Sequence, residues 1–354
     1  VSDVQMLEIL KAISYDSDII IMDEPTSAIT NKEVRTLFGK IKELKERGAC
    51  IIYISHKMEE IFEIADEITV FRDGKVIDSR PVEDYDLNLV ISQMVGREIS
   101  DSYPKKDLEI GETALEVKNL SSKGSFKDVN FAVKRGEIIG FAGLMGAGRT
   151  ELAMSIFGKA YGKKITGQVY KNGEEIFPNT VDKAIEYGIA YVIEDRKKLG
   201  LILEDNIKQN TTLTNLKKIS KNLVIDENKE IVVAEELRKQ MKTKCSSILQ
   251  KVGNLSGGNQ QKVVLSKWMF SEPDILILDE PTRGIDVGAK YEIYQLMNDL
   301  ASKDKGIIII SSEMPELIGT TDRIMVMSNG RLAGIVNTKE TTQEEIMALS
   351  AKYV

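Results

Sequence analysis

A short aliphatic run that ends in two acidic residues constrains the fold of this chain most strongly. Residues 275–278 read Ile-Leu-Ile-Leu, and Asp279 and Glu280 follow at once. Such a run is typical of a parallel strand covered on both faces, which delivers the next residues to the carboxyl edge of its sheet. At that edge Asp279 can hold Mg²⁺ through water, and Glu280 can polarise an attacking water. A core strand with a solvated acidic end is the alternative for this stretch taken alone.

The same pattern occurs twice, at a constant offset. Adding 256 to the numbers of residues 23–26 gives residues 279–282, and both stretches read Asp-Glu-Pro-Thr. The match needs no gap over the first 75 residues, so a duplication is the first feature of the organisation. Val1 corresponds to Gly257. We therefore expect the chain to be part of a longer tandem protein whose first copy has lost its phosphate loop.

A glycine-rich loop precedes the second acidic strand. Residues 143–150 read Gly-Leu-Met-Gly-Ala-Gly-Arg-Thr, after a strand predicted over 137–142 and before a helix. This order is typical of a P-loop, in which backbone N–H groups cradle phosphates and a threonine hydroxyl binds Mg²⁺. A plain glycine-rich turn is the alternative, and the acids downstream argue against it. The usual lysine is Arg149, which keeps the charge without the compact ammonium group, so we expect nucleotide binding with weaker hydrolysis.

A second glycine motif lies between this loop and the acidic strand. Residues 255–261 read Leu-Ser-Gly-Gly-Asn-Gln-Gln. Glycines let backbone N–H groups approach a phosphate closely, and the helix that follows directs its positive end there. Together with the acidic strand, the motif resembles the signature and Walker B strand of the nucleotide-binding domain of ABC transporters.

The resemblance implies an α/β fold of the P-loop NTPase class. It implies a RecA-like core, an antiparallel β subdomain and a helical subdomain, with a polar helical insert over about 207–251. It also implies the C-terminal part of a first ABC domain over 1–95, a linker over 96–112 and a complete second domain over 113–354.

The resemblance also assigns roles to individual residues. The implied catalytic residues are Glu24, His56 and Glu280. The implied Mg²⁺-binding residues are Asp23, Asp279 and Thr150. The implied nucleotide-binding residues are Gly143, Met145, Gly146, Ala147, Gly148, Arg149 and Thr150 of the P-loop, Glu194 at the Q-loop position, and Ser256, Gly257, Gly258 and Gln260 of the signature.

His56 is the only histidine in the chain. A lone histidine at a strand end is most often just a polar residue. Its place, one crossover after an acidic pair, is nevertheless that of the family's switch histidine, which contacts the γ-phosphate. The offset places Ser312 at the equivalent position of the second copy, and a serine cannot carry the histidine's charge.

ABC domains pair head to tail, so each nucleotide lies between one copy's P-loop and acids and the other copy's signature. On this resemblance Asp23, Glu24 and His56 work with the intact signature at 255–258. The second copy's acids face a first-copy signature, residues 1–5, that lacks both glycines. We expect the first site to hydrolyse ATP and the second mainly to bind it, and the chain alone to be a weak ATPase.

The motifs at 53–60, 94–98, 253–262 and 279–290 resemble those of the ATP-binding subunit of bacterial monosaccharide importers. The resemblance implies ATP and Mg²⁺ as cofactors and ATP hydrolysis coupled to import of galactose or methyl galactoside, xylose or ribose. The implied partners are transmembrane permease subunits and, through them, a sugar-binding protein. The implied location is the cytoplasmic face of the membrane.

Charge and segment lengths weigh against other classes. A net charge of −7 without a long basic run argues against nucleic acid as a partner. No apolar run approaches the roughly 20 residues of a membrane span. A tandem ATPase that acts on ribosomes needs a long basic linker, a repair-type ATPase needs a coiled coil, and the sequence has neither. A regulatory or non-transport tandem ABC ATPase that binds nucleotide with little turnover is the alternative function.

Overall fold

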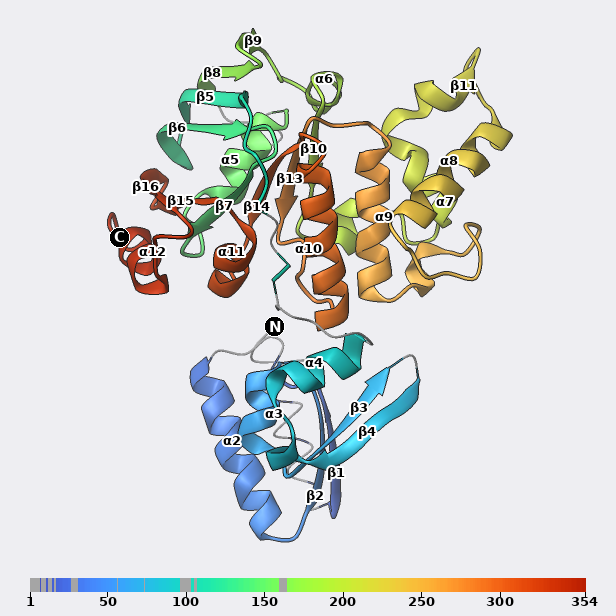
Figure 1. Cartoon of the computed structure of the whole chain (residues 1–354), viewed down its shortest axis with the longest axis vertical. Helices are drawn as coiled ribbons and strands as arrows, with labels where there is room; N and C mark the ends of the chain where they lie inside the picture. The colour runs from blue at the N-terminus through green and yellow to red at the C-terminus, as the bar shows by residue number, and fades with distance from the viewer. Residues whose placement is uncertain are drawn as a thin grey trace. The chain divides into compact units, whose positions relative to one another are not determined.

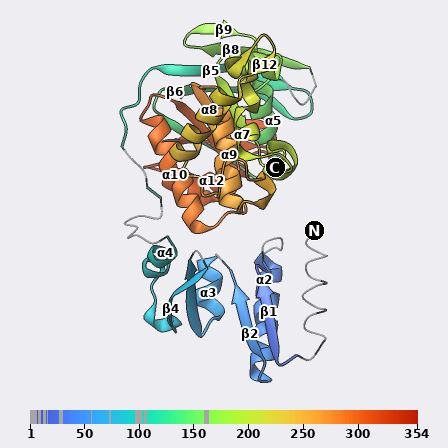
Figure 2. The same cartoon turned by 90° about the vertical axis from the view of Figure 1, so that its right-hand side faces the viewer.

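The computed structural model describes residues 7, 11, 15, 17–26, 31–55, 57–72, 74–95, 103–104, 107–158 and 164–354. The chain divides into two compact units, Val1–Ser100 and Asp101–Val354 (Figure 1 and Figure 2). The division falls within the segment 96–112 that the sequence analysis expects to be a linker. Each unit has buried hydrophobic residues of its own.

The second unit is built on a six-stranded sheet in the order β10–β13–β14–β7–β15–β16. Its strands are β7 (Ile138–Gly143), β10 (Ile189–Val192), β13 (Ile275–Asp279), β14 (Gly306–Ile310), β15 (Arg323–Ser328) and β16 (Arg331–Asn337). The first five in this order run parallel, and β16 returns antiparallel beside β15. Every residue of β13 and β14 is buried, as their aliphatic runs predict for strands covered on both faces.

Helices pack against this sheet and complete the core. They are α5 (Arg149–Ile156), α6 (Val181–Glu186), α9 (Gly257–Met269), α10 (Val287–Ala301), α11 (Met314–Thr320) and α12 (Gln343–Ser350). Helices α9 and α10 contact each other side by side, and α11 and α12 pack against β7 (Figure 1). None of the helices in the described part of the chain combines the length and the apolar character that a bilayer crossing requires.

Two smaller parts accompany the central sheet. One is an antiparallel sheet in the order β6–β5–β8–β9, made of β5 (Thr113–Ser122), β6 (Phe126–Lys134), β8 (Ile165–Lys171) and β9 (Glu174–Ile176). The other contains α7 (Ile207–Thr212), a 3₁₀ helix (Leu213–Ile219) and α8 (Glu227–Gln240). The predicted α/β fold with an antiparallel β subdomain and a helical subdomain is therefore confirmed.

The expected helical insert over about 207–251 is correct only in part. Between its two α-helices lies a short hairpin of β11 (Ser220–Lys221) and β12 (Val224–Ile225). Asn222 and Leu223 connect these strands with φ angles of 50° and 67°, the left-handed conformation of a two-residue hairpin turn. No sequence signal predicts this turn, because leucine stands where such turns usually carry glycine.

The strands and α-helices of the first unit repeat those of the C-terminal part of the second unit, from β13 onward. Its elements are β1 (Ile19–Asp23), α2 (Asn31–Glu46), β2 (Cys50–Ile54), α3 (Met58–Ile64), β3 (Glu67–Arg72), β4 (Lys75–Pro81), a 3₁₀ helix (Val82–Asp84) and α4 (Leu87–Val95). Adding 256 to the bounds of β1, β2, β3 and β4 gives those of β13, β14, β15 and β16. The pairing registers match as well, and both hairpins carry an irregularity at the same position. The repeat thus extends from the sequence to the backbone hydrogen bonds.

The two copies differ in what covers their paired strands. Ile277 of β13 is 0% exposed, whereas the matching Ile21 of β1 is 65% exposed. In the described part of the first unit, β1 and β2 form a sheet of two strands, while β10 and β7 flank their counterparts in the second unit. The same kind of residue is therefore core in one copy and surface in the other.

These matched positions allow a test of the two environments. We expect Ile277→Ala to lower the free energy of unfolding by about 2–5 kcal/mol, because it opens a cavity in a close-packed core. Ile21→Ala should cost less than about 1 kcal/mol, since that side chain is already largely in water. Urea unfolding followed by circular dichroism measures both changes, and equal losses would contradict this account of burial.

Candidate functional site

The loop between β7 and α5 has the backbone of a phosphate-binding loop. Gly146 and Gly148 have φ angles of 78° and 94°, and Gly148 is the N-cap residue of α5. These left-handed conformations favour glycine. At Gly143 a Cβ atom would come within 2.5 Å of the Met327 carbonyl oxygen, so no side chain fits there. The loop leads directly into the positive end of α5, an arrangement that suits an anion.

Arg149, the first residue of α5, makes a contact that the sequence did not predict. Its Nη1 donates a hydrogen bond to the carbonyl oxygen of Ser311 at 2.7 Å. The guanidinium thus joins the start of α5 to the chain just after β14. Of the other predicted loop residues, Met145 is fully exposed and Ala147 is buried.

Asp279, at the end of β13, is only 1% exposed. Its Oδ2 accepts hydrogen bonds from Thr150 Oγ1 at 2.9 Å and from the Tyr191 hydroxyl at 2.6 Å. Burial raises the pKa of Asp279, and the two hydrogen bonds oppose that rise. Among the described residues, its Oδ1 has no hydrogen-bond partner although it is buried. A buried carboxylate oxygen left open beside a threonine hydroxyl fits a hard cation such as Mg²⁺.

The fold therefore brings together Thr150 and Asp279, two of the predicted metal-binding residues. Tyr191 was not assigned to the site by the sequence analysis. It lies in β10, the strand next to β13, and a tyrosine in an apolar strand gives no sign of its hydroxyl's partner. The only available signal was its polar group within a fully buried strand.

Glu280 follows in a strained backbone conformation. Its φ angle is 47°, in the left-handed region that is costly for residues other than glycine. Its amide donates to the Ile310 carbonyl at 2.9 Å, and its carboxylate accepts a hydrogen bond from Ser312 Oγ at 3.2 Å. Burial raises the pKa of Glu280 to about 7, against the opposing effects of Arg149 and Ser312. A carboxyl group that titrates near neutrality suits a general base.

The acidic pair of the first unit has the same backbone and different surroundings. Glu24 has a φ angle of 45°, and its amide donates to the Ile54 carbonyl at 2.8 Å. Asp23 and Glu24 are both exposed, whereas Asp279 is buried. His56, the predicted switch histidine, lies outside the described residues.

A buried threonine–glutamate pair accompanies each acidic strand end, and the sequence analysis did not identify it. Thr282 donates to Glu316 Oε1 at 2.6 Å, and Thr26 donates to Glu60 Oε2 at 2.7 Å. All four residues are buried. The offset of 256 relates the two pairs, so their recurrence was the signal that could have revealed them. Each pair fastens the turn after the acids to a helix, α11 or α3.

The signature lies at the start of α9, with Ser256 as its N-cap residue. Gln260, one turn into the helix, is 4% exposed and donates from Nε2 to a backbone carbonyl, so its side chain is engaged in the interior. Glu194, just after β10, forms an ion pair with Arg283, two residues beyond the acidic strand's proline. The predicted site residues of the second unit thus gather at the carboxyl edge of one sheet and at the start of α9.

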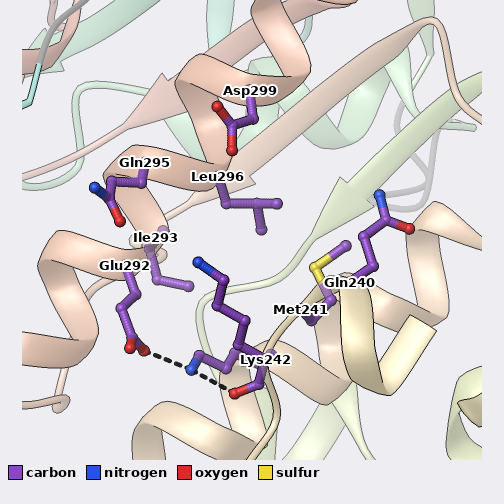
Figure 3. Close-up of a pocket in the computed structure, with 9 residues that line it drawn as sticks. Gln240, Met241, Lys242, Glu292, Ile293, Gln295, Leu296 and Asp299 are labelled. Atoms are coloured by element: carbon purple, nitrogen blue, oxygen red, sulfur yellow. Dashed lines mark hydrogen bonds and ion pairs between the residues drawn. The ribbon is translucent and has the colours of Figure 1, made fainter. Parts of the chain in front are cut away.

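A separate pocket lies between the end of α8, α9 and α10 (Figure 3). Met241 and Leu296 are among its apolar lining residues. Lys262 forms an ion pair with Glu292 at 2.5 Å and donates to the Lys242 carbonyl at 3.1 Å. These contacts connect α9 to α10 and to the segment just after α8, and the lining contains none of the P-loop or acidic-strand residues.

Glu280 gives a prediction for the pH dependence of stability. Its pKa is about 7 in the folded chain against an ordinary value of 4.5, so the unfolded chain releases this proton first as the pH rises. Through this group alone, the free energy of unfolding falls as the pH rises from 4.5 to about 7, and it falls no further above pH 7. We expect Glu280→Gln to gain stability relative to the unchanged chain across that window. Unfolding free energies measured for both proteins from about pH 5 to pH 8 test this, and a difference independent of pH would count against it.

Comparison with known proteins gives the family. A family model described as ABC transporter matches residues 126–283, the stretch that holds the P-loop, the signature and the acidic strand. The L-arabinose transport ATP-binding protein AraG of Geobacillus stearothermophilus is 53% identical over 98% of this chain and 70% of its own length. The galactose/methyl galactoside import ATP-binding protein MglA of Fusobacterium nucleatum is 52% identical over 100% of this chain and 71% of its own length.

Solved structures share the fold. An ATP-binding cassette of an ABC transporter in its ADP conformation matches 68% of this chain and 96% of its own, with a TM-score of 0.55 and 20% identity. A dimeric post-hydrolysis cassette bound to ADP and Pi matches 64% of this chain and 100% of its own, with a TM-score of 0.54 and 21% identity. The chain belongs to the ABC transporter family, among the ATP-binding subunits of sugar import systems.

Proposed function

We propose that this chain hydrolyses ATP to energise the import of a monosaccharide by an ABC transporter. The observation that carries the nucleotide-binding part of this proposal is the hydrogen bond of 2.9 Å between Thr150 of the phosphate-binding loop and the buried Asp279. The named relatives are an L-arabinose transport protein and galactose/methyl galactoside import proteins. Because their identities to this chain are nearly equal, the proposal extends to monosaccharides as a class and not to one sugar.

We infer that Thr150 and Asp279 hold Mg²⁺ with the bound nucleotide, Asp279 through water. The buried Oδ1 of Asp279, which has no hydrogen-bond partner among the described residues, supports this assignment. Among the described residues, no cluster of three or more His, Cys, Asp or Glu side chains is placed to hold a metal by itself. That agrees with an ion that takes its other ligands from phosphate and water. When bound, Mg²⁺ neutralises charge on the transferred phosphoryl group.

Hydroxyl groups of the chain hold the two carboxylates of this site. Tyr191 and Thr150 both donate to Asp279 Oδ2, which orients the carboxylate and leaves the buried Oδ1 without a hydrogen-bond partner among the described residues. Glu280 is the group proposed to accept a proton from the attacking water, and its pKa of about 7 supports that role. Ser312 holds the Glu280 carboxylate but brings no positive charge.

We further propose that residues 1–95 are the C-terminal part of a first ABC domain and residues 113–354 a complete second one, joined by the segment 96–112. The matching elements and strand registers support this division. In the longer tandem protein, head-to-tail pairing would combine Asp23, Glu24 and His56 of the first copy with the signature at 255–258, and this site would carry most of the hydrolysis. The second site would mainly bind nucleotide, because Ser312 stands at the histidine position.

The proposed partners are permease subunits that span the membrane and, through them, a sugar-binding protein. ABC importer ATPase subunits in general work with such proteins, and relatives of this chain are named as transport or import ATP-binding proteins. On this proposal the chain lies at the cytoplasmic face of the membrane and is attached through the permease. The sugar is selected by those partners.

One observation favours a second candidate, a domain that binds nucleotide and regulates with little turnover. Arg149, which replaces the usual lysine of the loop, donates to the Ser311 carbonyl at 2.7 Å. A guanidinium engaged in this way is less free to follow the transferred phosphate than a flexible ammonium group. Phosphate release measured on the subunit assembled with its permease separates the two functions.

The two acidic strands give a prediction for turnover in an importer assembled with the longer tandem protein. We expect Glu24→Gln to lower ATP turnover by about 100-fold or more, because it removes the general base of the proposed hydrolytic site. Glu280→Gln should lower it by less than about 10-fold, because the second site contributes little turnover. Phosphate release measures both rates, and equal losses would count against two unequal sites.

Asp279 gives a prediction for metal dependence. Asp279→Asn should weaken Mg²⁺-dependent ATP binding by about 10-fold or more, because a neutral amide holds the metal's water ligands less well than a carboxylate. Binding measured in EDTA should change less. Tyr191→Phe is the matched variant, since it removes one hydrogen bond and keeps the carboxylate, and its effect should be smaller. A titration in which the Asn variant keeps its full Mg²⁺ dependence would remove Asp279 from the site.

A further inference from the structure

Arg196 joins two segments that the sequence separates widely. It begins the π-helical turn Arg196–Gly200, which follows β10. Its Nη1 donates to the Arg283 carbonyl at 2.7 Å, and its Nη2 donates to the Gly284 carbonyl at 3.0 Å. A planar guanidinium can serve two successive carbonyls at once, which an ammonium group cannot do with the same geometry.

The contact between these segments is reciprocal. The side chain of Arg283 forms an ion pair with Glu194, which lies two residues before Arg196. Both partners of this pair are well exposed, so on its own it contributes little. The half-buried Arg196, bonded to backbone carbonyls, is therefore the stronger of the two links.

The signature also packs against Arg196 and Gly284. A Cβ atom on Gly257 would lie 2.8 Å from Arg196 Nη2 and 2.9 Å from the Gly284 carbonyl oxygen. The first signature glycine therefore packs directly on the hydrogen bond between Arg196 and Gly284. This gives Gly257 a packing role in addition to the phosphate approach expected from the sequence. We call Glu194, Arg196, Gly257, Arg283 and Gly284 the Arg196 junction.

A second contact fastens α9 to the same turn. Near the end of α9, Lys267 donates from Nζ to the carbonyl of Gly200 at 2.5 Å. Lys267 is buried, and Gly200 is the last residue of the π-helical turn. The signature helix is thus attached to the turn near both of its ends.

Strand β10 connects the Arg196 junction to the proposed phosphate-binding site. Strand β10 carries Tyr191, whose hydroxyl donates to Asp279 Oδ2 at 2.6 Å. Five residues farther along the chain is Arg196. Residues 191–196 therefore contact Asp279 at one end and, at the other, the residues beside the signature.

We propose that Arg196 is a positioning residue that couples nucleotide binding at the P-loop to the placement of the signature and of residues 283–286 in the same copy. The inference rests on the proposed function, because it requires nucleotide at the P-loop. This coupling lies wholly within the second unit.

Hydrogen–deuterium exchange on this chain, with and without ATP and Mg²⁺, tests the proposal. In the unchanged chain, nucleotide should slow amide exchange in peptides covering 256–260 and 283–286 by about fivefold or more. In Arg196→Gln, ATP should bind the P-loop within about twofold of the unchanged affinity, while the slowing at both peptides is lost. A purely structural role would instead raise exchange equally with and without nucleotide.

Three further variants sharpen the result. Lys198→Gln is the matched control, because Lys198 lies in the same turn and its side chain is 84% exposed; it should leave both affinity and slowing unchanged. Arg196→Lys keeps the positive charge but lacks the two-donor guanidinium group, so it should not restore the slowing of amide exchange by nucleotide. Arg283→Gln removes only the exposed ion pair, so it should retain most of the slowing and keeps the test valid if Arg196→Gln fails to fold.

The possible failures are distinguishable. If the unchanged chain binds no nucleotide, the proposed function itself is wrong and the coupling falls with it. If the chain binds nucleotide but the signature peptides do not respond, or if Arg196→Gln responds as the unchanged chain does, the coupling is wrong and the proposed function stands. If Arg283→Gln abolishes the slowing as fully as Arg196→Gln, the ion pair and not the Arg196 fork carries the coupling, which overturns the assignment to Arg196.

Discussion

The site depends most directly on the buried carboxylate of Asp279 and the two hydroxyl groups that hold it. Thr150 brings the start of α5 to it, and Tyr191 brings the neighbouring strand β10. A carboxylate at 1% exposure is costly unless it is hydrogen-bonded or binds a cation. Burial of the aliphatic strands in the parallel sheet offsets this unfavourable free energy. These strands hold the acid at the sheet edge where the P-loop also lies. The proposed phosphate and metal sites therefore both depend on one arrangement of strands.

The duplicated strands show how far surroundings can diverge while the backbone stays the same. Glu24 and Glu280 share a left-handed φ angle, of 45° and 47°, and each donates its amide to the end of the neighbouring strand. Asp23 is nevertheless exposed, while Asp279 is buried among its partners. Such strain persists where the structure around it holds it, and it is common at functional sites. Both copies repeat this strained turn, so the same backbone conformation presents the acids of each copy.

Features set by local spacing could be predicted from the sequence, and features set by long-range contact could not. The aliphatic run at 275–278 predicted β13, and the strand predicted over 137–142 corresponds to β7. The hydroxyl of Tyr191 meets Asp279 across 88 residues of sequence, and Arg196 meets Gly284 across the same separation. No spacing rule connects such pairs, because only the completed sheet places them side by side. The hairpin turn at Leu223 was missed for a different reason, since a leucine rarely adopts a left-handed conformation.

The central claim is that one phosphate-binding site, built on the P-loop and Asp279, belongs to this chain. Calorimetric titration of the chain with ATP in excess Mg²⁺ tests it most directly. The account predicts one nucleotide bound per chain, with binding strongly weakened in Thr150→Val. Two equivalent nucleotides per chain, or binding that Thr150→Val leaves unchanged, would contradict it.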